Sequence, residues 1–161
     1  MGIEPYTEQH MKAEESAAIL EDMLGLLGIK ATVELLDQGM TPVLNVRSNE
    51  SSRLIGSQGR TLNDLQYILN RMVYEMTPGA PKVVVDVEGY REVAHQKLIQ
   101  KAQKAAEAVR QWGDIVELEP MSSYDRWLIH QEFKDDKEVE TRSVEVEDSM
   151  MKAILLRPCR D

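Results

Sequence analysis

Two stretches in the first half of the chain carry apolar residues at helical spacing. Residues 8–28 place them three or four positions apart, and Gly28 suits the position after a last helical turn. Residues 61–76 give the clearest pattern and stop before the helix-breaking Thr77-Pro78-Gly79. The apolar stripe of this stretch consists of Leu62, Leu65, Leu69, Met72 and Met76, with Ile68 and Val73 beside it. Both stretches are predicted to be amphipathic helices.

Strand patterns lie before and after residues 61–76. Residues 31–36 alternate between apolar and polar positions, and the turn signal Asp37-Gln38-Gly39 separates them from a second strand at 43–47. The two strands should form a hairpin. Residues 82–87 (KVVVDV) are an almost continuous β-branched run, which is typical of a buried strand.

A short helix at 50–55, capped by Ser48 or Asn49, completes this part of the chain. The predicted order over residues 8–87 is α-β-β-α-α-β. Such an order makes one α+β layer with its own core.

The second half of the chain mixes helices and strands again. A long helix is expected at 90–112, with an inward side made of Ala94, Leu98, Ala102, Ala105, Val109 and Trp112. The further predicted elements are a strand at 115–118, a helix at 122–133 capped by Ser122 or Ser123, and strands at 139–146 and 152–157 around a turn at 147–149. We therefore predict an α+β fold of two domains, residues 8–88 and 89–158.

Composition narrows the class of protein. With 161 residues, 42% hydrophobic and 29% charged, the chain can bury a core. The single cysteine, Cys159, excludes an internal disulfide and a multi-cysteine metal site. No apolar run approaches the roughly 20 residues that span a bilayer, and the N-terminus has neither a basic start nor an apolar signal core. We expect a cytoplasmic protein without membrane insertion.

The charge distribution matters more than the net charge of −9, which by itself opposes binding to phosphates. Residues 1–46 hold two basic and eight acidic groups, residues 47–91 hold six and five, and residues 92–161 hold eleven and fifteen. The acidity therefore lies toward both ends. Any phosphate-binding patch must be small and local.

A Gly-x-x-Gly segment, Gly56-Ser57-Gln58-Gly59, lies between the two adjacent helices predicted at 50–55 and 61–76. Glycines allow a sharp turn and let a sugar-phosphate backbone approach without a Cβ in the way. In a KH domain such a loop clamps about four nucleotides of single strand. Arg53 and Arg60 flank the loop, and Ile55 would belong to an apolar floor for the bases. An ordinary corner between two helices is the alternative.

Arg126 and His130 are four positions apart on a predicted helix and should share one face. A guanidinium pairs with phosphate, an imidazole donates or stacks, and a nearby ring such as Phe133 can carry a base. If His130 meets phosphate as the cation, binding should strengthen as the pH falls through about 6.5. The alternative is a surface arginine beside a packing histidine. A second pair of this spacing, Arg91 and His95, is interpreted as structural.

Two segments resemble one bacterial family. Residues 53–70 (RLIGSQGRTLNDLQYILN), followed by 85–91 (VDVEGYR), and residues 116–130 (VELEPMSSYDRWLIH) are similar to the Jag family, the SpoIIIJ-associated RNA-binding proteins also called KhpB or EloR. The resemblance covers about residues 10–158. It implies a type II KH domain joined to a small α+β Arg-x-x-x-His (R-three-H) domain.

The resemblance also implies a function. It points to single-stranded RNA binding, to post-transcriptional control linked to cell elongation, division or sporulation, and to a small single-KH partner of the KhpA type or a homodimer. The family's loop usually carries two basic middle residues, where this chain has Ser57 and Gln58, and a basic residue follows the motif arginine, where this chain has Trp127. Trp127 is either a stacking platform or part of the core, and we favour the core. The uncharged loop and the net charge favour an alternative function, a protein-interaction adaptor with weak RNA affinity.

The remaining candidates have ordinary interpretations. Lys97, Lys101 and Lys104 form a basic stripe, either a solvated helix face or an extension of the RNA path. Ser122, Ser123, Asp125 and His130 lie on one short helix, which cannot place a carboxylate behind the imidazole and a hydroxyl before it. The histidines and Cys159 lack metal-ligand spacing. We therefore expect no enzyme activity, no cofactor and no metal.

Overall fold

The computed structural model describes residues 5–36 and 41–159, and the predicted turn at Asp37-Gln38-Gly39 lies outside the described residues. The chain divides into two compact units, Met1–Arg91 and Glu92–Asp161. Both mix helices with a three-stranded sheet, so the predicted α+β class is confirmed.

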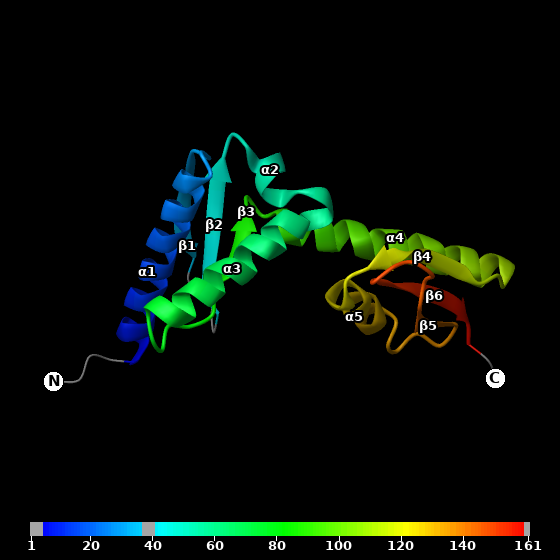
Figure 1. Ribbon diagram of the computed structural model, residues 1–161. Helices are drawn as coiled ribbons and strands as arrows, with labels where there is room; N and C mark the ends of the chain where they lie inside the picture. The colour runs from blue at the N-terminus through cyan, green and yellow to red at the C-terminus, as the bar shows by residue number, and fades with distance from the viewer. Residues whose placement is uncertain (1–4, 37–40, 160–161) are drawn as a thin grey trace. The chain divides into compact units, whose positions relative to one another are not determined.

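The first unit follows the predicted order α-β-β-α-α-β (Figure 1). Its elements are α1 (Pro5–Leu26), β1 (Ala31–Leu36), β2 (Val43–Ser48), α2 (Ser51–Ile55), the short 3₁₀ helix η1 (Ser57–Gly59), α3 (Arg60–Met76) and β3 (Val84–Val87). The sheet has the strand order β1-β2-β3. β1 and β2 are antiparallel, which confirms the hairpin, and β2 and β3 are parallel.

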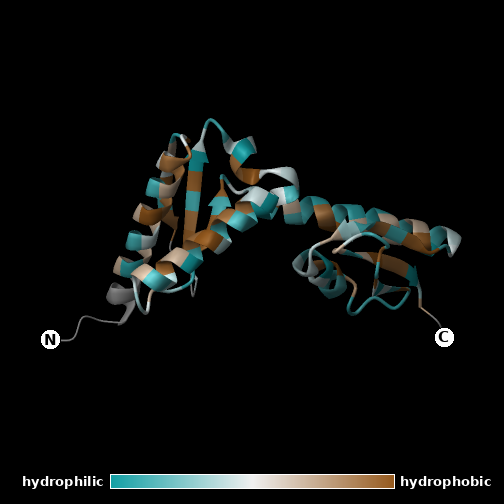
Figure 2. Ribbon diagram, in the orientation of Figure 1, coloured by the Kyte–Doolittle hydropathy of each residue, from teal (hydrophilic) through white to brown (hydrophobic). Residues whose placement is uncertain are grey.

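One face of this sheet and the helices enclose the core. Figure 2 shows hydrophobic and hydrophilic bands alternating along α1 and α3, as expected of amphipathic helices. Buried residues of α1, α3 and the strands form one cluster, including Leu20, Leu24, Leu44, Val46, Leu62, Leu69 and Val85. Thr32, Glu34 and Arg47 belong to the other face and are exposed. The pleat thus separates a packed face from a polar one.

Two details of the first unit correct the sequence prediction. Val73 takes a buried position on α3, whereas Met76 is 62% exposed, because the core cluster ends one turn before the last residue of the helix. Ile68 is 49% exposed, because it lies beside the buried stripe of Leu62, Leu65 and Leu69 and not on it. The predicted cap of α2 is also wrong. Glu50 occupies the cap position without a side-chain bond, and Ser48 Oγ instead accepts the Glu50 N–H at 3.1 Å.

Side chains form hydrogen bonds with the outer edge of β3, the edge that faces away from β2. Asn70 Nδ2 donates to the Val83 carbonyl at 2.8 Å, and Asn70 Oδ1 accepts the Val83 N–H at 2.9 Å. Gln66 Oε1 accepts the Val85 N–H, and Arg91 Nε donates to the Val85 carbonyl. Val83 therefore bonds to a side chain, and β3 begins at Val84 rather than at the predicted residue 82.

The second unit packs two helices on an antiparallel sheet (Figure 1). Its elements are α4 (Tyr90–Trp112), whose first two residues belong to the first unit, β4 (Val116–Met121), α5 (Ser123–Glu132), β5 (Val139–Val144) and β6 (Lys152–Pro158). The strand order is β4-β6-β5. Its core contains Ala102, Ala106, Val109, Leu118, Ile129, Phe133, Val139, Ile154 and Leu156.

The predicted helices and strands of this unit are confirmed, with two refinements. Ser122 is the cap of α5, since its Oγ accepts the Asp125 N–H at 3.1 Å. Trp112, expected on the inward side of α4, is 68% exposed, because the buried side ends at Val109. Within the described residues, none of the helices combines the length and the apolar character needed to cross a bilayer.

Candidate nucleic-acid interface

The Gly-x-x-Gly segment forms a tight turn between α2 and α3. Gly56, Gln58 and Gly59 all have positive φ angles, of 69°, 54° and 75°. A Cβ at Gly56 would lie 2.1 Å from Thr61 Oγ1, and one at Gly59 would lie 3.0 Å from the Tyr90 ring. The positive φ angles favour glycine at both positions, and at Gly56 there is also no space for a Cβ.

The middle of the loop faces solvent while its flanks are anchored. Ser57 and Gln58 are exposed, and Gly59 is buried. Ile55 is half-buried and packs against the core of the first unit. The loop thus presents two polar side chains on a fixed backbone, with an apolar residue next to it, as a strand-binding loop requires.

Most arginines of the first unit already have a carboxylate partner. Arg53 is bonded to Glu50, Arg47 Nη2 lies 3.1 Å from Glu34 Oε2, and Arg71 Nη2 lies 3.3 Å from Glu75 Oε1. Arg60 is exposed and has no ion pair with any residue in the described part of the chain. These pairs are solvent-exposed and weak, so phosphate could compete for the guanidinium groups.

Arg126 and His130 meet on one face of α5, as their spacing predicts, and both contact β5. Arg126 Nη1 donates to Ser143 Oγ at 2.8 Å. His130 Nε2 lies 3.1 Å from the same Ser143 Oγ, and His130 Nδ1 lies 2.6 Å from Thr141 Oγ1. The hydroxyl of Ser143 therefore joins the two motif residues.

Thr141 and Ser143 were not identified from the sequence. The alternation Val139-Thr141-Ser143 on a predicted strand places all three on one face, and Val139 is buried there. That alternation was the available signal. It could not show which helix this face would meet.

The environment of His130 favours its neutral form. Burial lowers the pKa of His130 below its usual value, and the neighbouring Arg126 charge lowers it further. Arg126 Nε is buried without a hydrogen-bond partner among the described residues. A histidine cation at this site therefore requires a lower pH than the expected 6.5.

The burial of the two aromatic residues near this motif, Trp127 and Phe133, is the reverse of what the sequence predicted. Phe133, expected to carry a base, is buried in the core. Trp127, expected in the core, is 49% exposed and stacks on Tyr124, with ring centroids 5.8 Å apart. Ile129 and Phe133 already fill the space beneath α5, so the larger indole remains outside.

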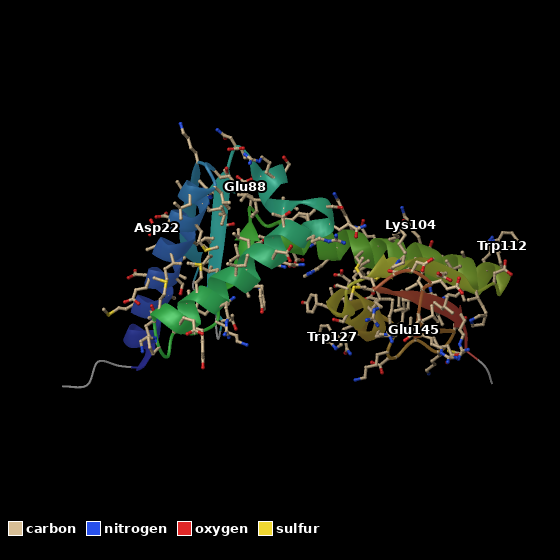
Figure 3. All side chains as sticks on the ribbon, viewed as in Figure 1. Asp22, Glu88, Lys104, Trp112, Trp127 and Glu145 are labelled. Atoms are coloured by element: carbon tan, nitrogen blue, oxygen red, sulfur yellow. The ribbon has the colours of Figure 1, made fainter. Side chains whose placement is uncertain are left out.

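The other candidate residues are placed as follows. Lys97, Lys101 and Lys104 are exposed on α4 (Figure 3 labels Lys104), and Lys101 Nζ lies 3.0 Å from Glu119 Oε1. Ser122 Oγ is bonded to Asp125 at 2.8 Å, while His130 contacts β5, so the structure does not assemble a hydrolase triad from these residues. Arg91 bonds to Asn63 and Gln66, in line with a structural role.

No group of three or more histidine, cysteine, aspartate or glutamate residues with the geometry of a metal site occurs in the part of the chain that the structure describes. The candidate residues of the second unit that carry positive charge or an aromatic ring lie on α4 and α5, and the two motif residues contact β5. They can bind phosphate, sugar hydroxyls or planar rings.

Comparison with known proteins gives a consistent picture. The R-three-H domain family matches residues 96–149, which include Arg126 and His130. The RNA-binding protein KhpB of Clostridium symbiosum is 32% identical over 117 residues, 73% of this chain and 53% of the relative. Those of Lactiplantibacillus plantarum and Bacillus subtilis are 36% and 30% identical, again over 73% of this chain, and over 36% and 56% of the relatives. The chain thus spans about a third to a half of the curated relatives that it matches.

Proposed function

Because this chain belongs to the Jag family of KhpB-like proteins and carries an R-three-H domain, we propose that it binds single-stranded RNA through a KH-type first unit and the R-three-H domain. The observation that carries the proposal is the turn at Gly56–Gly59. Its backbone is fixed by three positive φ angles, and its middle residues are open to solvent. The role is binding rather than catalysis.

The proposed binding residues of the first unit are Arg53, Ile55, Gly56, Ser57, Gln58, Gly59 and Arg60. Amides of the loop and the start of α3 meet the phosphates, which also draw Arg53 and Arg60. Ile55 supports a base. Arg126 and His130 hold a further stretch of the strand, and Lys97, Lys101 and Lys104 extend the path on α4.

The proposed cellular role is that of a cytoplasmic post-transcriptional regulator, linked to cell elongation, division or sporulation. Its proposed protein partner is a small single-KH protein of the KhpA type, or a second copy of this chain. These proposals rest on family membership alone, and co-purification of the chain with its RNA and protein partners would test them.

Charge reversal in the loop tests the RNA-binding proposal. Ser57→Asp with Gln58→Asp leaves both glycines in place, and aspartate tolerates the positive φ of residue 58. The variant should bind single-stranded RNA at least about tenfold more weakly in fluorescence anisotropy at fixed salt, because two carboxylates face the phosphates.

The matched control adds the same charge at exposed positions outside the loop, as Gln111→Glu with Ser149→Asp. It should bind like the wild type. Equal affinity of a folded loop variant and this control would rule out the loop as the RNA site, and absence of binding by the wild type would overturn the function itself.

An adaptor function is the second candidate, because three arginines of the first unit are paired with carboxylates and the net charge is −9. In that case the wild type and the loop variant should capture the same protein partner, while RNA binding stays weak in both. Light scattering with and without a small single-KH protein would distinguish this outcome.

A further inference from the structure

Three rings of the second unit form a row that the proposed function does not yet use. Tyr124 and Trp127 on α5 are 54% and 49% exposed, and their planes differ by only 25°. The imidazole of His95 on α4 lies 5.4 Å from the Tyr124 ring. We call His95, Tyr124 and Trp127 the aromatic row (Figure 3 labels Trp127).

Helical spacing places the aromatic row beside the Arg126–His130 face. Residues three or four positions apart are neighbours on a helix, so Tyr124 adjoins Trp127, and Trp127 adjoins His130. The row therefore continues into the imidazole of His130, which the Ser143 hydroxyl links to the guanidinium of Arg126. Two nearly parallel exposed rings and the guanidinium of Arg126 therefore belong to one helix, α5.

We propose that the aromatic row is a stacking platform for unpaired bases, with Trp127 as its outer ring. The inference rests on the proposed RNA-binding function and extends it to a site that recognises the π-face of a base, with Arg126 beside it for the phosphate. Nearly parallel exposed rings offer an offset stack to a planar ligand. Stacking of this kind accepts any base, because every base has a π-face.

The size of the surface favours a base over a protein partner. A stable protein interface covers roughly 800 Å² on each side and 20–30 residues. Around the aromatic row, the exposed neighbours Ser123, Gln131 and Glu132 are polar, and Leu128 is half-buried. Three rings in a polar surround match the dimensions of one or two bases.

Tryptophan fluorescence reports directly on the platform, because the chain has only two tryptophans, Trp112 and Trp127. Trp112→Phe leaves Trp127 as the sole indole. An oligoadenylate well beyond the roughly four nucleotides that fill the loop site should quench its fluorescence, and an abasic oligoribonucleotide of the same length should not. The reciprocal variant, Trp127→Phe, retains Trp112 at the end of α4 (Figure 3) and should show no quenching with either strand.

Affinity supplies the second measurement. Tyr124→Leu with Trp127→Leu keeps an apolar side chain at both positions and removes both rings, so the oligoadenylate should bind about fivefold or more weakly, as expected for the loss of base stacking. Trp112→Leu is the matched control, because it removes an indole that is 68% exposed and outside the row. Its affinity should equal that of the wild type.

The outcomes separate this inference from the proposed function. RNA binding by the wild type with no quenching of Trp127, or with equal quenching by the abasic strand, overturns the platform and leaves the function intact. No RNA binding by the wild type overturns both. The quenching experiment leaves Tyr124 and Trp127 in place, so it remains decisive even if the double leucine variant fails to fold.

Discussion

At the scale of single residues, His130 holds the R-three-H motif together. Its two ring nitrogens lie within hydrogen-bond distance of Thr141 and Ser143 on β5, and Arg126 shares the Ser143 hydroxyl. A protonated imidazole can only donate, so it would lose any bond in which a ring nitrogen accepts. The neutral ring suits this site better.

The lowered pKa of His130 predicts a pH dependence of stability. Because the folded value lies below the unfolded value of about 6.5, the unfolded chain binds the proton more readily. The contribution of His130 to stability is therefore fully present above about pH 6.5 and falls as the pH drops through that value toward the folded pKa. Urea denaturation at about pH 7.5 and about pH 5.5 should show a lower free energy of unfolding at the acid value.

Histidine variants identify the source of that difference. His130→Gln should reduce the gap between the two pH values, because the titrating group is removed, whereas His95→Gln should leave it largely as in the wild type. If His130→Gln retains the whole gap, another group is responsible. If a cationic His130 strengthens RNA binding, the lowered pKa means that this strengthening should be seen only below about pH 6.5.

The sequence predicted local relations between residues and missed tertiary ones. The spacing of Arg126 and His130 was enough to place them on one face of a helix, because that relation depends only on helix geometry. It could not identify Ser143, which comes from a strand that folds against the helix. The burial of Trp127 and Phe133 was predicted the wrong way round for the same reason, because only packing decides which ring fits beneath α5.

At the scale of elements, α3 both builds the core and completes the sheet. Leu62, Leu69 and Val73 face the core cluster, while Gln66 and Asn70, one turn apart, bond the outer edge of β3. The sequence showed the apolar stripe of this helix. It did not show the polar pair, because glutamine and asparagine on a helix are ordinarily interpreted as solvent-facing.

Loss of this edge contact should destabilise the first unit. Asn70→Ala leaves the N–H and the carbonyl of Val83 without their partner, which costs about 1–3 kcal/mol for each group that stays buried. Urea denaturation should show a correspondingly lower free energy of unfolding. Asn49→Ala, at an exposed position, is the control and should change stability by less than about 0.5 kcal/mol. Equal values for the two variants would mean that water replaces the side chain.

At the scale of the whole molecule, one continuous helix joins the two proposed sites in sequence. α4 begins at Tyr90, whose ring packs against Gly59, and it ends at Trp112 in the second unit. If the loop and the aromatic row bind one strand, the second contact becomes intramolecular. Tethering of this kind raises affinity by about 10²–10⁴-fold over either site alone.

Oligonucleotide length tests this coupling. A strand of about four nucleotides fills the loop site only, so Tyr124→Leu with Trp127→Leu should leave its affinity unchanged and should weaken a strand long enough for both sites. The loop variant, Ser57→Asp with Gln58→Asp, should weaken both strands. Anisotropy at one fixed salt concentration would measure both lengths. Equal losses on the short and the long strand for the leucine variant would show that the sites act independently.

The hydrogen-bonded edge of β3 also limits how copies of this sheet can join by strand pairing. Growth of a fibre by strand addition requires two open edges on every sheet, one to accept a strand and one to offer it. In the sheet β1-β2-β3, the peptide groups of Val83 and Val85 on the outer edge of β3 are already bonded to Asn70, Gln66 and Arg91. Strand addition at β3 is therefore blocked, and β1 is the other edge of this sheet, where the Val33 N–H is itself bonded to Glu21 Oε1 at 3.3 Å. Three polar side chains thereby prevent this sheet from growing in two directions.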